Sequence, residues 1–256
     1  MQRINVKDLH TDIFPELKAQ WNFSDTEISV PDVSKNGHML FPVGNPKFTK
    51  DPQLFSAANL NGRNQWLSST SAIINTNESF SVAIWVRLSG ELLNNEINLE
   101  EGRNALTAVS QNSKTHAGFY LGLRKYKENQ LNETPKIIYK WCFALAPISM
   151  DFPGIHACSS EILSTDNLNK WTFLVAVCDI ENRCIKLYIP TSNQFQNTPI
   201  PTSWVLWNAT NEFQIGRGQW DGVTVDQWPG SIGPTRVYKG ALSFEQSKVL
   251  YHQDIL

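Results

Sequence analysis

Alternating apolar and polar residues recur along this chain and predict β-strands. The clearest case is the segment 79–90, in which every second residue from Phe80 to Val86 is apolar and falls on one face of an extended chain. Further segments of this kind are 118–126, 136–145, the hairpin-like 170–189, 211–218 and 230–240. Because clusters of Asn, Pro, Gly and Ser separate them, the pattern favours an all-β sandwich or barrel over βαβ units.

One helix is predicted near the end of the chain, over residues 241–253. Ser243 is a good N-cap, and Gln246 follows three residues later, as in a capping box. Phe244 and Leu250 give this helix an apolar face. It is too short to be stable alone, so we expect it to pack on the sandwich.

Composition and charge narrow the class of function. The chain has 256 residues, 41% of them hydrophobic and 18% charged, as in an ordinary globular protein. The formal net charge of −2 gives no electrostatic reason to expect a nucleic acid or an anionic membrane as partner. No apolar run approaches membrane-spanning length, and the start MQRINVKDLHTDIF lacks the apolar core of a signal peptide. We therefore expect either a cytosolic protein or a mature domain cut from a longer secreted chain.

The domain organisation is simple. No internal repeat or low-complexity linker divides the strand-like segments, so a single domain is expected over residues 21–256. Residues 1–20 are interpreted as an N-terminal linker or an additional edge segment.

Four cysteines bear on the cellular compartment. Cys178 and Cys184 flank the polar turn DIENR, so they are placed to face each other across a hairpin. Cys142 and Cys158 bracket a segment with two prolines and a glycine. A disulfide between them would raise the free energy of unfolding by about 3 kcal/mol. We favour two disulfides and an oxidising, extracytoplasmic setting, and the alternative is four reduced, buried thiols. Zinc binding is disfavoured, because neither pair has the close spacing of zinc ligands.

Several segments resemble, in the right order, the laminin-G-like domains of the concanavalin A-like lectin/glucanase superfamily, of the bacterial secreted type. Near its C-terminus the chain has GSIGPTRVY and, shortly after it, ALS, where the family has G-S-I-D-x-V-R-V-Y and A-L-S. Earlier blocks are PDVSKNGHML, AANLNGRNQWLSS with NESFSVAIWVRLS, and NKWTFLVAVCDIENRCIKLYI. The resemblance implies a jelly-roll sandwich of two antiparallel sheets with a short C-terminal helix. This fold hosts lectins, glycosidases and adhesion modules.

The same resemblance implies a calcium site. Family members often bind Ca²⁺ through an early aspartate loop and an aspartate in the last strand. Asp32, Ser34 and Asn36 are placed to supply oxygen ligands in this chain. Gly233 stands where the family has the last-strand aspartate, so the site would depend on another carboxylate nearby or on a glycine carbonyl. The alternative is a plain turn capped by Asp32.

The segment 216–230 carries the candidate ligand site. Sugar-binding sites pair an aromatic platform with carboxylates and amides, and this glycine-rich loop offers all three. The predicted ligand-binding residues are Trp220, Asp221, Asp226, Gln227 and Trp228. The alternative is that both tryptophans pack back onto the sheet.

No catalytic motif is found in the sequence. A retaining glycosidase needs two carboxyl groups about 5 Å apart, and the E-x-D-x-x-E pattern that would supply them on this fold is missing. Asp179 and Glu181 have strand-like spacing but fall in a turn, and the acidic segment 96–103 lacks strand alternation. The sequence therefore predicts a non-catalytic module of a larger secreted or surface protein, which binds carbohydrate or a glycosylated surface. The alternatives are a protein–protein adhesion or assembly domain and, third, a glycoside hydrolase.

Overall fold

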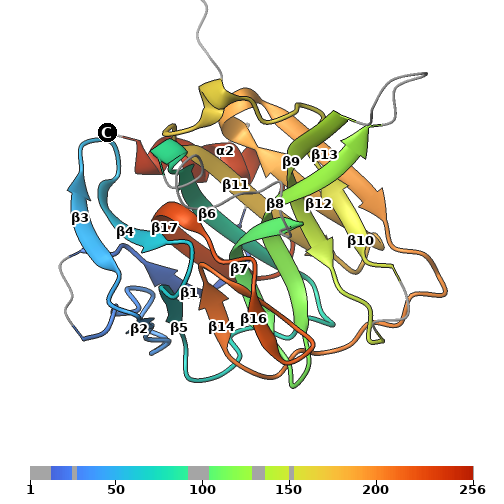
Figure 1. Cartoon of the computed structure of the whole chain (residues 1–256). Coiled ribbons are helices and arrows are strands. Elements are labelled where there is room, and N and C mark those ends of the chain that lie inside the picture. The colour runs from blue at the N-terminus through green and yellow to red at the C-terminus, as the bar shows by residue number, and fades with distance from the viewer. Residues whose placement is uncertain (1–12, 25–27, 92–103, 129–135, 150–152, 256) are drawn as a thin grey trace, which may run out of the picture.

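The computed structural model describes residues 13–24, 28–91, 104–128, 136–149 and 153–255. Within these residues the chain forms two large antiparallel sheets packed face to face, with the helix α2 (Phe244–Asp254) on the outside (Figure 1). The predicted jelly-roll sandwich with a C-terminal helix is confirmed.

The first sheet contains the long central strands. Its strands, in spatial order, are β13 (Gln194–Pro199), β12 (Cys184–Ile189), β11 (Thr172–Asp179), β6 (Phe80–Leu88), β17 (Pro229–Lys239), β4 (Phe55–Asn61) and β3 (Lys47–Asp51). A further strand, β1 (Glu16–Trp21), pairs with β17 beyond the end of β4. The predicted division after residue 20 therefore falls inside a strand of this sheet, whereas residues 1–12 lie outside the described part of the chain.

The second sheet faces the first. Its spatial order is β10 (Ile155–Cys158), β9 (Lys136–Leu145), β8 (Ala117–Glu128), β7 (Ala105–Asn112), β14 (Phe213–Ile215), β5 (Trp66–Ser68) and β2 (Phe41–Val43). A separate hairpin joins β15 (Gly218–Trp220) to β16 (Val223–Val225). Two short 3-10 helices, η2 (Thr165–Asn167) and η3 (Pro190–Ser192), flank the hairpin of β11 and β12.

The core lies between the two sheets and is rich in aromatic rings. Phe80 of β6 contacts Phe119 of β8 in the opposite sheet, with ring centroids 5.1 Å apart. Phe143 contacts the Phe80 ring edge-on, with centroids 6.1 Å apart. These inward residues are the alternate apolar positions that the sequence pattern identified, and pairing them between sheets is what holds a sandwich together.

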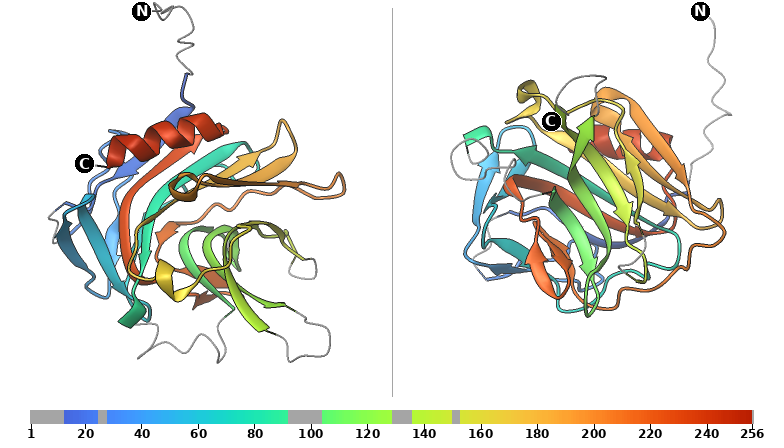
Figure 2. Two further views of the ribbon diagram at one scale, coloured as in Figure 1. Left: turned by 90° about the horizontal axis from the view of Figure 1, so that it is seen from above. Right: turned by 45° about the vertical axis from the view of Figure 1, so that its right-hand side comes forward.

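Helix α2 covers the outer face of the first sheet (Figure 2). The predicted capping box is confirmed, because the Ser243 hydroxyl accepts from the Gln246 N–H while the Gln246 side chain accepts from the Ser243 N–H. Tyr251 stacks on Trp85 of β6 at 5.5 Å. This face of the sheet is therefore buried too. Among the described residues, none of the helices is of a length and apolar character suited to crossing a bilayer.

The cysteines divide into one disulfide and two free thiols. Cys142 and Cys158 are directly opposite each other on β9 and β10 and form the predicted disulfide. The second predicted disulfide is wrong, because Cys178 and Cys184 are free and buried. On the β11–β12 ladder Asp179, not Cys178, is the partner of Cys184. This offset of one residue turns the two thiols to opposite faces of the sheet.

Candidate functional site

The candidate ligand site is built on the hairpin β15–β16, which stands beside the second sheet (Figure 1). Asp221 and Gly222 form its two-residue turn with φ angles of 49° and 72°, the left-handed values of a type I′ turn that Asp-Gly favours. The Gly222 N–H donates to the Thr115 carbonyl at 2.6 Å. The Gln219 side-chain amide donates to the Lys114 carbonyl at 3.2 Å. The tip of the hairpin is therefore fixed against the neighbouring turn.

Trp220 presents a supported aromatic ring to solvent. The residue is 40% exposed, and its ring centroid lies 5.7 Å from the buried His116 ring, which lies 5.0 Å from the Trp207 ring. His116 Nε2 is 2.8 Å from the Pro147 carbonyl, which only accepts, so Nε2 carries a proton and donates it, and Nδ1 is 3.0 Å from the Thr115 hydroxyl. A fixed imidazole thus backs the Trp220 ring and holds it in place.

The structure brings only one of the predicted polar residues to the hairpin tip. Asp221 is exposed and directly follows Trp220. Asp226 and Gln227 are half-buried where the hairpin rejoins the sandwich, and the Asp226 carbonyl accepts from the Thr107 N–H at 2.7 Å. The ligand-accessible pair is therefore Trp220 with Asp221.

Trp228 lies in the core instead of at the surface. Its side chain is fully buried and stacks on Trp141 of β9, with ring centroids 6.1 Å apart and the rings 26° from parallel. Its backbone N–H donates to the Gly216 carbonyl at 2.9 Å. A ligand at the surface cannot reach this ring, so the predicted set of ligand residues loses Trp228.

The predicted calcium loop is arranged as a capped turn. The Asp32 carboxylate accepts backbone N–H bonds from Gln20, Ser34 and His38 at 2.9–3.0 Å. Burial opposes ionisation of Asp32, but the bond from the Ser34 side chain and those from the three backbone N–H groups outweigh it and lower the pKa of Asp32. The Asn36 amide donates to backbone carbonyls of β1.

These contacts do not fit a calcium ion. Three N–H groups point at the carboxylate and occupy the approach that a cation needs. Gly233 has no room for the family's aspartate, because an added Cβ would lie 2.8 Å from the Trp85 Cβ. Within the described residues, no group of three or more His, Cys, Asp or Glu side chains is placed to hold a metal. Calcium binding stays a prediction that the loop geometry does not support.

Asp179, the last residue of β11, has a structural role. Asp179 forms an ion pair with Lys186 at 2.6 Å and also accepts from the Asn182 amide at 2.8 Å. Burial raises the pKa of Asp179, but the bonds from Lys186 and Asn182 lower it below its usual range. The other acidic segment considered, 96–103, lies outside the described residues.

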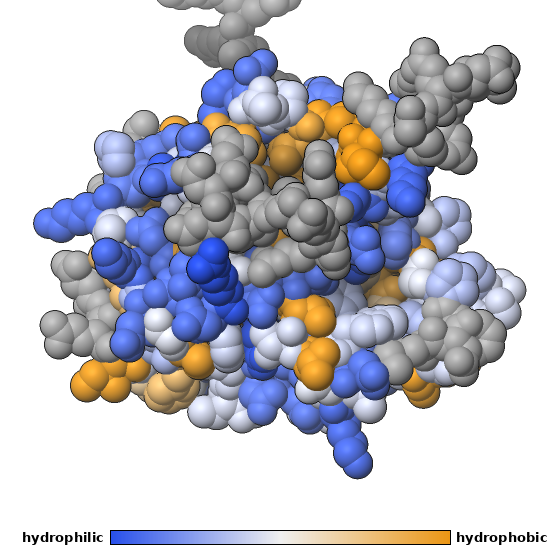
Figure 3. All heavy atoms as spheres, viewed as in Figure 1, coloured by the Kyte–Doolittle hydropathy of each residue, from blue (hydrophilic) through white to orange (hydrophobic). Residues whose placement is uncertain are grey.

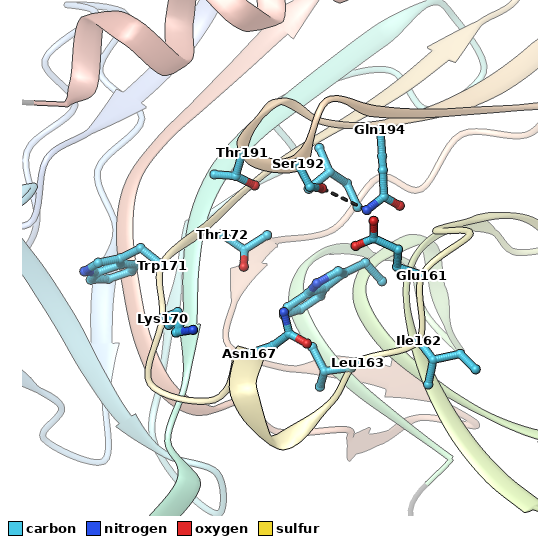
Figure 4. A pocket seen from close by; sticks show the side chains of 12 residues that line it. Glu161, Ile162, Leu163, Asn167, Lys170, Trp171, Thr172, Thr191, Ser192 and Gln194 are labelled. Carbon is cyan, nitrogen blue, oxygen red and sulfur yellow. Dashed lines mark hydrogen bonds between the residues drawn. The ribbon is translucent and has the colours of Figure 1, made fainter.

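The sequence indicated neither of two concave surfaces that the described residues form. One is a polar groove of about 230 Å³ between the two sheets, with Trp141 and Thr172 among its lining residues (Figure 4). The other is an apolar pocket of about 550 Å³ near the edge strands β10 and β13, where Ile155, Pro199 and Trp204 contribute. Their residues come from segments far apart in sequence, so no local motif marks either surface.

The fold and a family model agree on the class of protein. A family model described as the concanavalin A-like lectin/glucanases superfamily matches residues 152–246, from β10 to the first turn of α2. The other described strands complete the two sheets of the same jelly roll. The predicted resemblance to laminin-G-like domains of the concanavalin A-like superfamily is confirmed.

Solved structures of low sequence identity share this fold. Domain 4 of AbnA, a GH43 extracellular arabinanase from Geobacillus stearothermophilus, was solved in complex with arabinotriose; it is 20% identical with a TM-score of 0.58, over 92% of this chain and 98% of that chain. The botulinum neurotoxin serotype D binding domain is 16% identical with a TM-score of 0.63, over 93% of this chain and 52% of that one.

A third structure is the binding domain of Paraclostridial Mosquitocidal Protein 1, 13% identical with a TM-score of 0.62, over 93% of this chain and 52% of that one. This chain thus spans about half the length of the two toxin binding domains. At these identities the likeness establishes the fold alone. No curated protein matches this chain in sequence.

Proposed function

We propose that this chain is a non-catalytic carbohydrate-binding module of a larger secreted or surface protein. The observation that carries the proposal is the exposed Trp220 ring, backed by His116 and followed by the exposed carboxylate of Asp221. The complex of the similar AbnA domain with arabinotriose supports a carbohydrate as the class of ligand.

The chemistry of the hairpin suits a sugar. An indole ring is attracted to the apolar C–H face of a pyranose, while a carboxylate accepts hydrogen bonds from its hydroxyl groups. The Asp221–Gly222 turn and the contacts of its tip hold Trp220 in place before binding. A preorganised ring loses little conformational freedom when a ligand arrives, so more of the contact energy remains as affinity.

An extracytoplasmic location is part of the proposal. The Cys142–Cys158 disulfide supports it, because disulfides persist mainly in oxidising compartments. The similar AbnA domain comes from a protein described as extracellular.

The test is a glycan array probed with the folded wild-type chain, with Trp220→Ala and with Phe195→Ala. Phe195 is a matched control, because it is an exposed aromatic residue on β13, in the first sheet. Loss of an anchoring Trp typically costs about 2 kcal/mol, so Trp220→Ala should weaken binding roughly thirtyfold while the control binds like wild type. An array with no bound glycan, or equal binding by wild type and Trp220→Ala, would overturn the proposal.

A protein–protein adhesion domain is the second candidate. The apolar pocket beside β10 and β13 favours it, because Ile148 and Val205 on its wall are 57% and 59% exposed. Against it, hydrophilic residues dominate the face drawn in Figure 3, and the apolar ones form small separate patches. A folded chain that binds no glycan but loses a protein partner on Val205→Asp would favour this candidate.

A further inference from the structure

We propose that the polar groove between the two sheets is a second carbohydrate-binding site, which holds one neutral pyranose ring. The groove has a volume of about 230 Å³. Four side chains and a ring carry the argument: Glu161, Lys170, Thr172, Gln194 and the ring of Trp141. The inference goes beyond the function proposed above, because the groove shares no residue with the hairpin site.

Residues from both sheets line the groove. Thr172 begins β11 and Gln194 begins β13 in the first sheet, while Trp141 belongs to β9 in the second. Glu161 comes from the segment that follows β10. In Figure 4, Thr172 points into the groove, and Glu161 and Gln194 lie on the opposite wall. Polar groups therefore converge on one space from separate parts of the chain.

The polar groups of the groove are available to a ligand. Within the described part of the chain, the structure assigns no hydrogen bond to the side chains of Glu161, Lys170 and Thr172. Gln194 is held in position, because its amide donates to the Ser192 hydroxyl at 2.8 Å and its carbonyl accepts from the Ser160 hydroxyl at 3.2 Å.

These groups match the hydrogen-bonding needs of a sugar. Each sugar hydroxyl both donates and accepts, and the groove pairs an acceptor, the Glu161 carboxylate, with a donor, the Lys170 ammonium. The two charges also offset each other, so the groove favours a neutral sugar over an anionic one.

An aromatic ring forms part of the groove wall. Trp141 lines the groove and is 8% exposed, so a small part of its side chain is open to a ligand. Trp228 stacks on the Trp141 ring, with centroids 6.1 Å apart, and this contact limits rotation of the Trp141 ring. Trp228 is thus a positioning residue for the groove. The combination of a ring with a carboxylate and an amide is the chemistry expected of a sugar site, here found in a concave surface.

The size of the groove limits the ligand. Pockets that enclose drug-sized molecules measure roughly 300–1,000 Å³, and the groove at about 230 Å³ falls below this range. It accommodates one sugar ring and leaves the rest of a longer glycan outside. A single ring held by a few hydrogen bonds binds weakly, with an expected Kd on the order of 1 mM.

The test is a nuclear magnetic resonance titration of the ¹⁵N-labelled chain with the methyl glycosides of glucose, galactose, mannose and N-acetylglucosamine. The assigned indole signals of Trp141 and Trp220 report the groove and the hairpin separately, so the failure of one proposal is distinguishable from the failure of the other. Glu161→Ala is the groove variant, and Glu181→Ala is its matched control, because both side chains are exposed and Glu181 lies in the distant β11–β12 turn.

The expected result is a saturable shift of the Trp141 indole signal with at least one glycoside. Glu161→Ala should weaken that binding about tenfold or more, as loss of a charge-assisted hydrogen bond does, and Glu181→Ala should leave it unchanged. Shifts confined to Trp220, equal binding by Glu161→Ala and wild type, or no shift with any of the four glycosides would each overturn the groove proposal.

Discussion

The buried ion pair between Arg236 of β17 and Asp254 of α2 offers the sharpest test of how the helix is held. The guanidinium donates to both carboxylate oxygens, at 2.7 and 2.6 Å, and the Trp85 indole N–H donates to the same carboxylate at 2.9 Å. The two charged side chains are only 11% and 6% exposed. Burial opposes the charge on Arg236, but the bond and charge of Asp254 outweigh it and raise its pKa.

Asp254→Ala should therefore be costly. It leaves a charged guanidinium and an indole N–H buried without an acceptor, and breaking such a pair typically costs about 3–5 kcal/mol. For a chain of this length that corresponds to a fall in Tm of roughly 10 °C. Replacing both partners, as Arg236→Met with Asp254→Ala, removes the uncompensated charge and should restore much of the loss.

The measurement is urea unfolding of wild type, both single variants and the double variant, followed by tryptophan fluorescence. A loss of less than about 1 kcal/mol for Asp254→Ala would contradict the reasoning, because it would mean that water replaces the carboxylate without cost. A double variant that is less stable than Asp254→Ala would contradict the second step.

Three further predictions concern other parts of the molecule. Reduction of the Cys142–Cys158 disulfide, which closes a loop with a sequence separation of 16, should lower the free energy of unfolding by about 3 kcal/mol, measured in urea with and without dithiothreitol. Burial and, to a smaller extent, the charge of Arg124 lower the pKa of His156 to about 4. Between about pH 6.5 and pH 4 the unfolded chain therefore binds a proton at His156 that the folded chain does not bind. The contribution of His156 to stability is then complete above about pH 6.5 and falls by about 2 kcal/mol toward pH 4, and His156→Gln should remove this contribution. Ca²⁺ and EDTA should leave Tm unchanged, whereas Asp32→Ala should cost about 1–2 kcal/mol; a Ca²⁺-dependent rise in Tm that Asp32→Ala abolishes would restore the calcium prediction.

Two of the strands that the sequence pattern identified match the structure closely. The segment 136–145 coincides with β9, and 230–240 differs from β17 by one residue at each end. The strand β7 was not identified, because its sequence ALTAVSQN has no regular alternation of apolar and polar residues. The strand β13 was missed because its sequence QFQNTP is mostly polar.

The candidate site was harder to predict, because it depends on register and on contacts between distant segments. The spacing of Cys178 and Cys184 was compatible with a hairpin disulfide, and only the one-residue offset of the ladder excludes it. Trp220 and Trp228 have the same local chemistry, yet one is exposed and the other stacks on Trp141, eighty-seven positions earlier in the chain. Local sequence carries no information on that partner.

The coverage of the first sheet on both faces has a consequence for the protein's motions. Strand β6 lies in the middle of that sheet, between β11 and β17, with the core on one side and the Trp85–Tyr251 contact with α2 on the other. Its amide protons should exchange with solvent only when the whole domain unfolds. The hairpin β15–β16 is a separate two-stranded sheet and should open at far lower free energy. The preorganised hairpin site can therefore be lost by local opening while the sandwich stays closed.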